Sequence, residues 1–193
     1  MIAQGDTVAV RQILRMGNPI LRERSRELSK EEIFSDWFTN LITDMTDSMH
    51  ATQGIGIAAP QIGELVRVSV IEFSPDSERY PDMGEQALKI FINPVLKVTN
   101  SEDQIFWEGC LSVPDLRGAV ARPSGVYVEY LDENAKPQSI QADGFFATVL
   151  QHEFDHLDGK LYIDRIKDLT KLSYIEEYKQ FWSPQALHEE LED

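Results

Sequence analysis

The stretch QHEFDHLDG, residues 151–159, decides the fold, because it predicts a helix that places histidine and carboxylate side chains in the interior of the domain. His152 and His156 are four positions apart, so on a helix both side chains lie on one face and can bind one divalent metal ion. Glu153 then lies beside the ion without being a ligand. This pattern is typical of metal-assisted hydrolysis, which needs a Lewis acid to activate water and a carboxylate to move the proton.

The same pattern also occurs by chance on surface helices, where the polar side chains simply face water. Here the apolar run GFFATVL, residues 144–150, leads directly into it, which predicts a buried helix. Burying histidines and carboxylates without partners costs ~1–3 kcal/mol for each unsatisfied group. A bound metal ion would supply the missing partner.

Two histidines leave a tetrahedral metal site one protein ligand short. A long metzincin motif would place a third histidine at position 162, after a glycine at 159. Gly159 is present, but position 162 is Tyr162. The two remaining histidines, His50 before a glycine-rich loop and His188 in an acidic tail, are better interpreted as a helix cap and a surface residue.

Cys110 is the best candidate for the third ligand. It is the only cysteine in the chain, so no internal disulfide can form. An isolated cysteine is usually a small buried apolar residue. Cys110, however, lies in WEGCLSVPDLRG, residues 107–118, which predicts a strand that ends in a shaped loop. One thiolate and two imidazoles suit zinc or ferrous iron, with a fourth position left for water.

The segment GIGIAAPQIG, residues 54–63, is rich in small residues that allow close approach of another group to the backbone. It lacks the lysine of a phosphate-binding loop and the third glycine of a dinucleotide fingerprint, so nucleotide binding is weakly supported. Read alone, it is equally consistent with a tight turn before a strand. Beside a metal site it would form one wall of a cleft, with the amide of Gln61 as a hydrogen-bond donor.

Length and composition predict one domain spanning residues 1–193; a tail from about residue 165 is expected to be its variable part. The chain has 193 residues, 42% of them hydrophobic, and a formal net charge of −15. Such acidity argues against direct binding of nucleic acid. No apolar run is long enough to cross a membrane, and the N-terminus lacks the pattern of a leader peptide, so we expect a cytoplasmic protein.

Periodicity predicts an α+β fold in which antiparallel strands surround a buried central helix carrying HExxH. A capping box at SKEE opens an amphipathic helix over 30–50, and the metal helix covers 144–158. The polar stretch 74–87 predicts a loop. The expected strands are 65–73, 89–98, 103–107, 126–131 and 137–142.

Three segments, GIGIAAPQIG (54–63), EGCLSVP (108–114) and QHEFDHLDG (151–159), carry a resemblance to the peptide deformylases. The resemblance covers the chain from about 13 to 162. It implies a metal-dependent hydrolase that removes the formyl group from the N-terminal formyl-methionine of newly made polypeptides and releases formate. It also implies N-formyl-methionyl nascent peptides as partners, in transient proximity to the ribosome.

The resemblance also implies roles for individual residues. It makes Cys110, His152 and His156 the metal ligands, Glu153 the general acid and base, and Gln61 with the backbone N–H of Leu111 the oxyanion donors. Gly56 would meet the formyl end of the substrate. The methionine side chain would enter a pocket of Ile55, Phe145 and Val149, Arg117 would hold the loop after the cysteine, and Glu108 with Arg122 would form a buried ion pair.

The ion itself is not determined by these ligands. The family favours Fe²⁺ in cells, and Zn²⁺, Ni²⁺ or Co²⁺ accept the same set. Two other functions remain as alternatives: a zincin-type metallopeptidase, which would need its third ligand downstream of the helix, and a non-catalytic protein that binds formyl-peptides.

The C-terminal region departs from family members that carry a basic tail helix for docking on the ribosome. Leu172, Ile175, Tyr178 and Phe181–Trp182 predict an apolar helix face, but the chain ends in the acidic HEELED, 188–193. Ribosomal RNA would repel that end. We therefore expect residues 165–193 to pack on the domain or on a second subunit.

Overall fold

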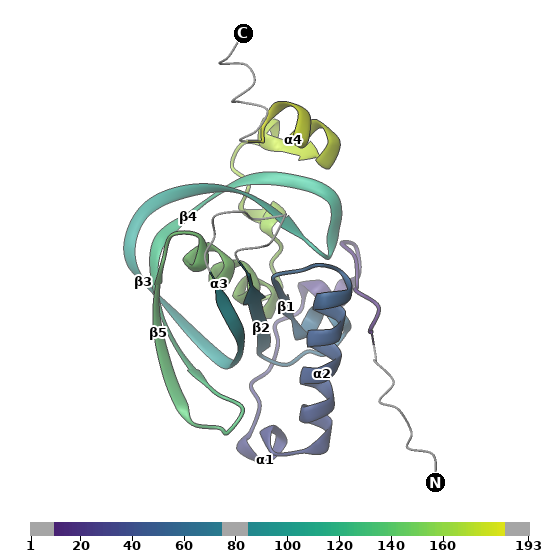
Figure 1. Cartoon of the computed structure of the whole chain (residues 1–193), viewed down its shortest axis with the longest axis vertical. Helices are drawn as coiled ribbons and strands as arrows, with labels where there is room; N and C mark the ends of the chain where they lie inside the picture. The colour runs from purple at the N-terminus through teal and green to yellow at the C-terminus, as the bar shows by residue number, and fades with distance from the viewer. Residues whose placement is uncertain (1–9, 75–84, 184–193) are drawn as a thin grey trace.

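The computed structural model describes residues 10–74 and 85–183, and the fold consists of one antiparallel sheet wrapped around a helix. Figure 1 shows α3 inside the arch of β3 and β4, with α2 on one side and α4 outside the arch. The helices are α1 (Lys30–Ile33), α2 (Asp36–Ala51), α3 (Gly144–Leu157) and α4 (Ile175–Phe181). The strands are β1 (Gly56–Ala58), β2 (Val68–Phe73), β3 (Gln86–Cys110), β4 (Val113–Leu131), β5 (Pro137–Asp143) and β6 (Leu172–Tyr174). Short 3-10 helices cover Pro19–Arg22, Ala59–Ile62, Tyr162–Arg165 and Leu169–Lys171.

The sheet has the order β1-β2-β3-β4-β5, with β6 paired to β4, and all of these pairings are antiparallel. Together with the buried helix it confirms the predicted fold class. Strands β3 and β4 form the long central hairpin of the sheet, paired from Ile92↔Leu131 to Cys110↔Val113. Several register shifts interrupt this ladder, and such irregularities bend strands and increase their twist. The hairpin can therefore arch over α3.

The central helix α3 is buried along most of its length, as the apolar run before the motif predicted. Ala147–Leu150 and His152–Leu157 are all buried. The chain leaves the helix through Gly159, whose φ is +70°. A Cβ at this position would lie 2.5 Å from the carbonyl oxygen of Arg22, so no larger residue fits without displacing the backbone. The N-terminal segment therefore lies directly against the end of α3, where the N–H of Ser25 also donates a hydrogen bond to the carbonyl of Leu157.

The predicted helix over 30–50 is divided into α1 and α2. Ser29 caps α1, in the predicted capping box with Glu32. Ser35 interrupts the run because its side chain accepts a hydrogen bond from the N–H of Phe38 and donates one to the carbonyl of Glu32. A second N-cap therefore replaces the continuous helix.

The predicted strands covered only parts of the two long strands of the hairpin, β3 and β4. Segments 89–98 and 103–107 are parts of the single strand β3, and β4 starts 13 residues before the predicted 126, at Val113. Residues 86–87, predicted as loop, belong to β3. The rest of the predicted loop up to 84, apart from residue 74, lies outside the described residues.

The described part of the C-terminal region packs on the domain, as expected. Strand β6 pairs with β4 from Leu116↔Tyr174 to Gly118↔Leu172. Leu172 therefore belongs to a strand, which corrects its assignment to the apolar helix face. Residues 184–193, including the acidic end, lie outside the described residues. Within the described chain, no helix is long and apolar enough to span a membrane.

Candidate metal centre and active site

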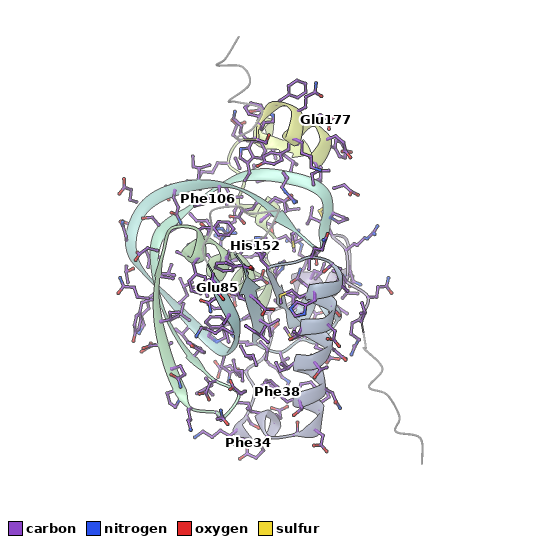
Figure 2. All side chains as sticks on the ribbon, in the orientation of Figure 1. Phe34, Phe38, Glu85, Phe106, His152 and Glu177 are labelled. Atoms are coloured by element: carbon purple, nitrogen blue, oxygen red, sulfur yellow. The ribbon has the colours of Figure 1, made fainter. Side chains whose placement is uncertain are left out.

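Helix α3 and the β3–β4 hairpin bring three potential metal ligands together. The ligand atoms of Cys110, His152 and His156 all lie within 4.8 Å of one another. The Sγ of Cys110, at the end of β3, is 3.3 Å from Nε2 of His156. His152 lies in the interior, under the arch of the hairpin (Figure 2). The predicted trio is thus assembled from two segments that are far apart in sequence.

The donor set fits a divalent transition metal ion. Bond lengths of about 2.3 Å to sulfur and about 2.1 Å to nitrogen place two tetrahedral ligand atoms about 3.6 Å apart, close to the observed separation of sulfur and nitrogen. All three residues are almost completely shielded from solvent. Soft thiolate and imidazole ligands suit zinc or ferrous iron better than magnesium or calcium.

A buried ionic network fixes the orientation of His152. Its Nδ1 is 2.8 Å from Oε2 of Glu108, which leaves the other ring nitrogen for the metal group. Glu108 in turn accepts two hydrogen bonds from Arg122, at 2.6 and 3.0 Å. Both partners are buried, so the predicted ion pair is present. Arg122 also donates to Asp155 at 2.8 Å, and Asp155 accepts further hydrogen bonds from Arg165.

The electrostatics of the group favour a thiolate. Burial raises the pKa of the Cys110 thiol, but the imidazoles of His156 and His152 outweigh burial and hold that pKa well below its usual value. Burial lowers the pKa of His152, whereas Cys110 and Glu108 together raise it well above its usual value. The thiolate is the form that binds metal ions.

Glu153 lies beside the metal group and faces Gly56 so closely that only glycine fits at position 56. A Cβ on Gly56 would lie only 2.5 Å from Oε1 of Glu153. Glu153 is 5% exposed. Burial raises its pKa to about 6, against the opposing effect of His152 and His156. A carboxyl group with such a pKa can both accept and donate a proton near neutral pH.

The amide of Gln61 is oriented by its own backbone. Its Oε1 accepts a hydrogen bond from the N–H of Ala58 at 2.8 Å, which turns Nε2 in the opposite direction. Nε2 donates to Oγ of Ser112 at 3.2 Å and lies 3.5 Å from Sγ of Cys110. An N–H donor therefore faces the metal group from β1 and its following turn.

These residues surround one pocket. Most residues predicted for the site line it, including the proposed methionine pocket. The lining consists of Gly54, Ile55, Gly56, Gln61, Trp107, Glu108, Gly109, Cys110, Leu111, Phe145, Thr148, Val149, His152 and Glu153.

Two members of the predicted set lie behind this pocket. His156 stands behind its wall with its Nε2 turned to Cys110. Arg117 lies on β4 and packs over Gly109, where a Cβ would come within 1.8 Å of its Nη1. Its contact with the segment around the cysteine agrees with a bracing role.

Sequence reasoning did not single out Trp107, Asp155 or Arg165 as functional. Asp155 stands inside the HExxH motif, and its burial on the helix could have signalled a partner. Trp107 directly precedes the EGCLS motif, which could have signalled a place in the pocket wall. Arg165, the partner of Asp155, carries by contrast no local sequence signal.

Fold and site together fit a metal-dependent hydrolase that carries HExxH on a buried helix and brings a cysteine beside both histidines. Comparison with known proteins agrees. The family model described as polypeptide deformylase matches residues 10–172. A peptide deformylase from Leptospira biflexa is 44% identical over 170 residues, which cover 88% of this chain and 95% of that protein. One from Brucella suis is 38% identical, covering 93% of this chain and 97% of that protein.

Solved structures give the same result. A Met-Ala-Ser-bound class I type b peptide deformylase from Acinetobacter baumannii has a TM-score of 0.80 and 37% identity, covering 83% of this chain and 100% of that chain. A peptide deformylase from Synechococcus elongatus in complex with actinonin has a TM-score of 0.74 and 31% identity, covering 96% and 94%. The chain belongs to the polypeptide deformylase family, which confirms the resemblance predicted from the three motifs.

Proposed function

We propose that the protein removes the formyl group from the N-terminal formyl-methionine of newly made polypeptides and releases formate. One observation carries this proposal: Cys110 and His152, grouped with His156 behind them, line a single pocket together with Glu153 and Gln61. Family membership favours this reaction over the zincin and binding-protein alternatives.

Cys110, His152 and His156 would hold one divalent ion, which we infer to be Fe²⁺ in cells, with Zn²⁺, Ni²⁺ or Co²⁺ as replacements. When bound, the ion supplies Lewis-acid chemistry, which polarises the formyl carbonyl and makes water more acidic. The Glu108–Arg122 pair keeps the His152 ring in the orientation that ligation requires.

Glu153 moves the proton. Its carboxylate accepts a proton from the attacking water and later donates it to the nitrogen of the leaving peptide. Burial in the pocket gives this carboxyl group a pKa of about 6, suited to both steps. The close contact with Gly56 limits how far the carboxylate can move.

Gln61 and the backbone N–H of Leu111 stabilise the oxyanion that develops on the formyl oxygen. The Nε2 of Gln61 is already directed toward the metal group, so little reorganisation is needed during the reaction. Each such donor is worth ~2.7–4 kcal/mol of barrier.

Substrate selection rests on the apolar side of the pocket. Ile55, Phe145 and Val149 line it and would receive the methionine side chain, while Gly56 leaves room for the formyl end. Arg117 acts behind the wall by holding Gly109 in place.

The expected cellular setting is the cytoplasm, with nascent peptides as partners in transient proximity to the ribosome. The net charge of −15 disfavours direct binding to ribosomal RNA, so we expect the enzyme to reach its substrate without an RNA contact.

The test is formate release from formyl-Met-Ala-Ser by protein purified without oxygen, with the metal content measured on the same sample. Acetyl-Met-Ala-Ser and an internally cleavable unblocked peptide serve as controls. Formate release alone supports the proposal, whereas internal cleavage identifies a peptidase. Binding of the formyl-peptide without turnover by metal-loaded protein identifies a binding protein. Cys110→Ser should lose both metal and activity, and retention of metal would exclude the assigned ligand set.

A further inference from the structure

Trp107 is placed between the pocket and the C-terminal helix. The side chains of its neighbours Glu108 and Cys110 both contact the histidines of α3. Because successive side chains of a strand point to opposite faces, the indole of Trp107 lies on the other face of β3. The residue nevertheless contributes to the lining of the pocket. Its position therefore affects the wall that the substrate meets.

Two aromatic residues contact that indole: Tyr178 in the middle of α4, and Trp182, which directly follows the helix. The ring centre of Tyr178 lies 5.0 Å from that of Trp107, and the ring centre of Trp182 lies 5.7 Å from that of Trp107. Lys171 places its Nζ 3.8 Å from the centre of the Trp182 ring. Such aromatic and cation–π contacts prefer defined geometries, so they restrict the orientation of Trp107.

Helix α4 is itself attached to the other strand of the hairpin. Strand β6, which leads into it, pairs with β4 at Arg117↔Ser173. Arg117 packs over Gly109, the second residue after Trp107. Consequently β6 and α4 form a continuous brace outside the hairpin, opposite the metal group, as the position of α4 outside the arch illustrates (Figure 1).

Apart from Leu172, this brace lies beyond the segment that the family model matches, which covers residues 10–172. We propose that α4, through Tyr178 and Trp182, positions Trp107 and with it the wall of the cleft formed by residues 107–111, so that the C-terminal helix tunes peptide binding. The proposal rests on the deformylase function proposed above. The alternative is that the same contacts contribute only to stability.

The experiment compares Tyr178→Ala and Trp182→Ala with the matched control Phe181→Ala, since Phe181 is on the same helix and 54% exposed. Kinetic constants are measured with formyl-Met-Ala-Ser, and binding of the product peptide Met-Ala-Ser is measured by calorimetry. We expect KM and the product Kd to rise by about 5- to 20-fold, with kcat changed by less than about threefold, because binding geometry is lost while the metal group stays in place. Tyr178→Phe and Trp182→Phe keep a ring and should restore near-normal constants.

Near-UV circular dichroism supplies a readout that does not depend on catalysis. Trp107 and Trp182 are close enough to couple, so Lys171→Met, which keeps both indoles but removes the contact over Trp182, should alter the tryptophan region of the spectrum, where Phe181→Ala leaves it unchanged. A lower melting temperature with unchanged KM and product Kd would overturn the proposal, as would equal effects of Phe181→Ala. If the alanine variants do not fold, Lys171→Met, which loosens Trp182 alone, should raise KM, and an unchanged KM in that variant would also overturn it. Failure of the wild-type protein to release formate would instead reject the proposed function.

Discussion

Gly56 faces the carboxylate of Glu153 so closely that a methyl group in place of its hydrogen would lie 2.5 Å from Oε1. The glycine in the first motif is therefore required by a neighbour on α3, in addition to any need for space around the substrate. The two motifs, almost a hundred residues apart, constrain each other through this contact.

We expect Gly56→Ala to lower kcat/KM by about 100-fold, because the carboxylate of Glu153 must move away from the position in which it transfers protons. Metal content should be unchanged, since the three atoms nearest to the new methyl group all belong to Glu153, which is not assigned as a ligand. Steady-state kinetics combined with metal analysis tests this. Near-normal activity would show that Glu153 can be displaced without loss of function.

Glu153→Gln should keep the shape of the side chain but remove its ability to accept a proton. Turnover is expected to fall by about 10²–10⁴-fold while the ion remains bound. Glu102→Gln, on an exposed part of β3, is the matched control and should have no effect. A variant at 153 that retains most of its kcat would remove the general-base assignment.

Arg122→Ala should destabilise the protein strongly, because Glu108 would be left buried without its cation. Removing one partner of such a pair typically costs ~3–5 kcal/mol. The control is Arg26→Ala, which breaks an exposed pair with Glu32 and should cost at most about 1 kcal/mol. Denaturant unfolding measures both. We also expect Arg122→Ala to retain metal less well. If Arg122→Ala and Arg26→Ala unfolded at the same denaturant concentration, the Glu108–Arg122 pair would not stabilise the protein as a buried ion pair.

Peroxide should inactivate the iron form faster than the zinc form. Ferrous iron on a thiolate can be oxidised at the metal or at sulfur, whereas zinc has no accessible redox state. Activity and cysteine oxidation are followed over time in samples loaded with each ion. Equal rates for both forms would place the damage at the Cys110 thiol alone.

The central helix and the placement of its two histidines on one face could be predicted because their signals are local. The apolar run before HExxH and the spacing of His152 and His156 are both contained in residues 144–156. The early part of β4 could not be predicted, because Pro123 and Gly125 suggest a break in the strand. In the structure β5 pairs with β4 only from Gly125 onward, so the missing N–H of Pro123 is not needed on that side.

The three residues of the candidate metal group and the Glu108–Arg122 pair behind His152 were likewise predictable from the motifs, whereas the outer contacts were not. Arg165 reaches Asp155 from a segment after the helix, and Tyr178 reaches Trp107 from α4. Such contacts depend on the path of the chain after the last motif. The apolar spacing around Tyr178 predicted a helix face, but it did not indicate which residue that face would contact.

Cys110 and His156 lie 46 positions apart in the chain. An ion held by both would act as a cross-link between the end of the hairpin and the central helix, and loop-closure entropy for a link of this span is on the order of 4 kcal/mol. Because binding free energy at such a site adds to folding free energy, loading with metal would also govern how often the molecule opens to proteases. We therefore expect metal supply to set the cellular lifetime of the protein as well as its rate of turnover.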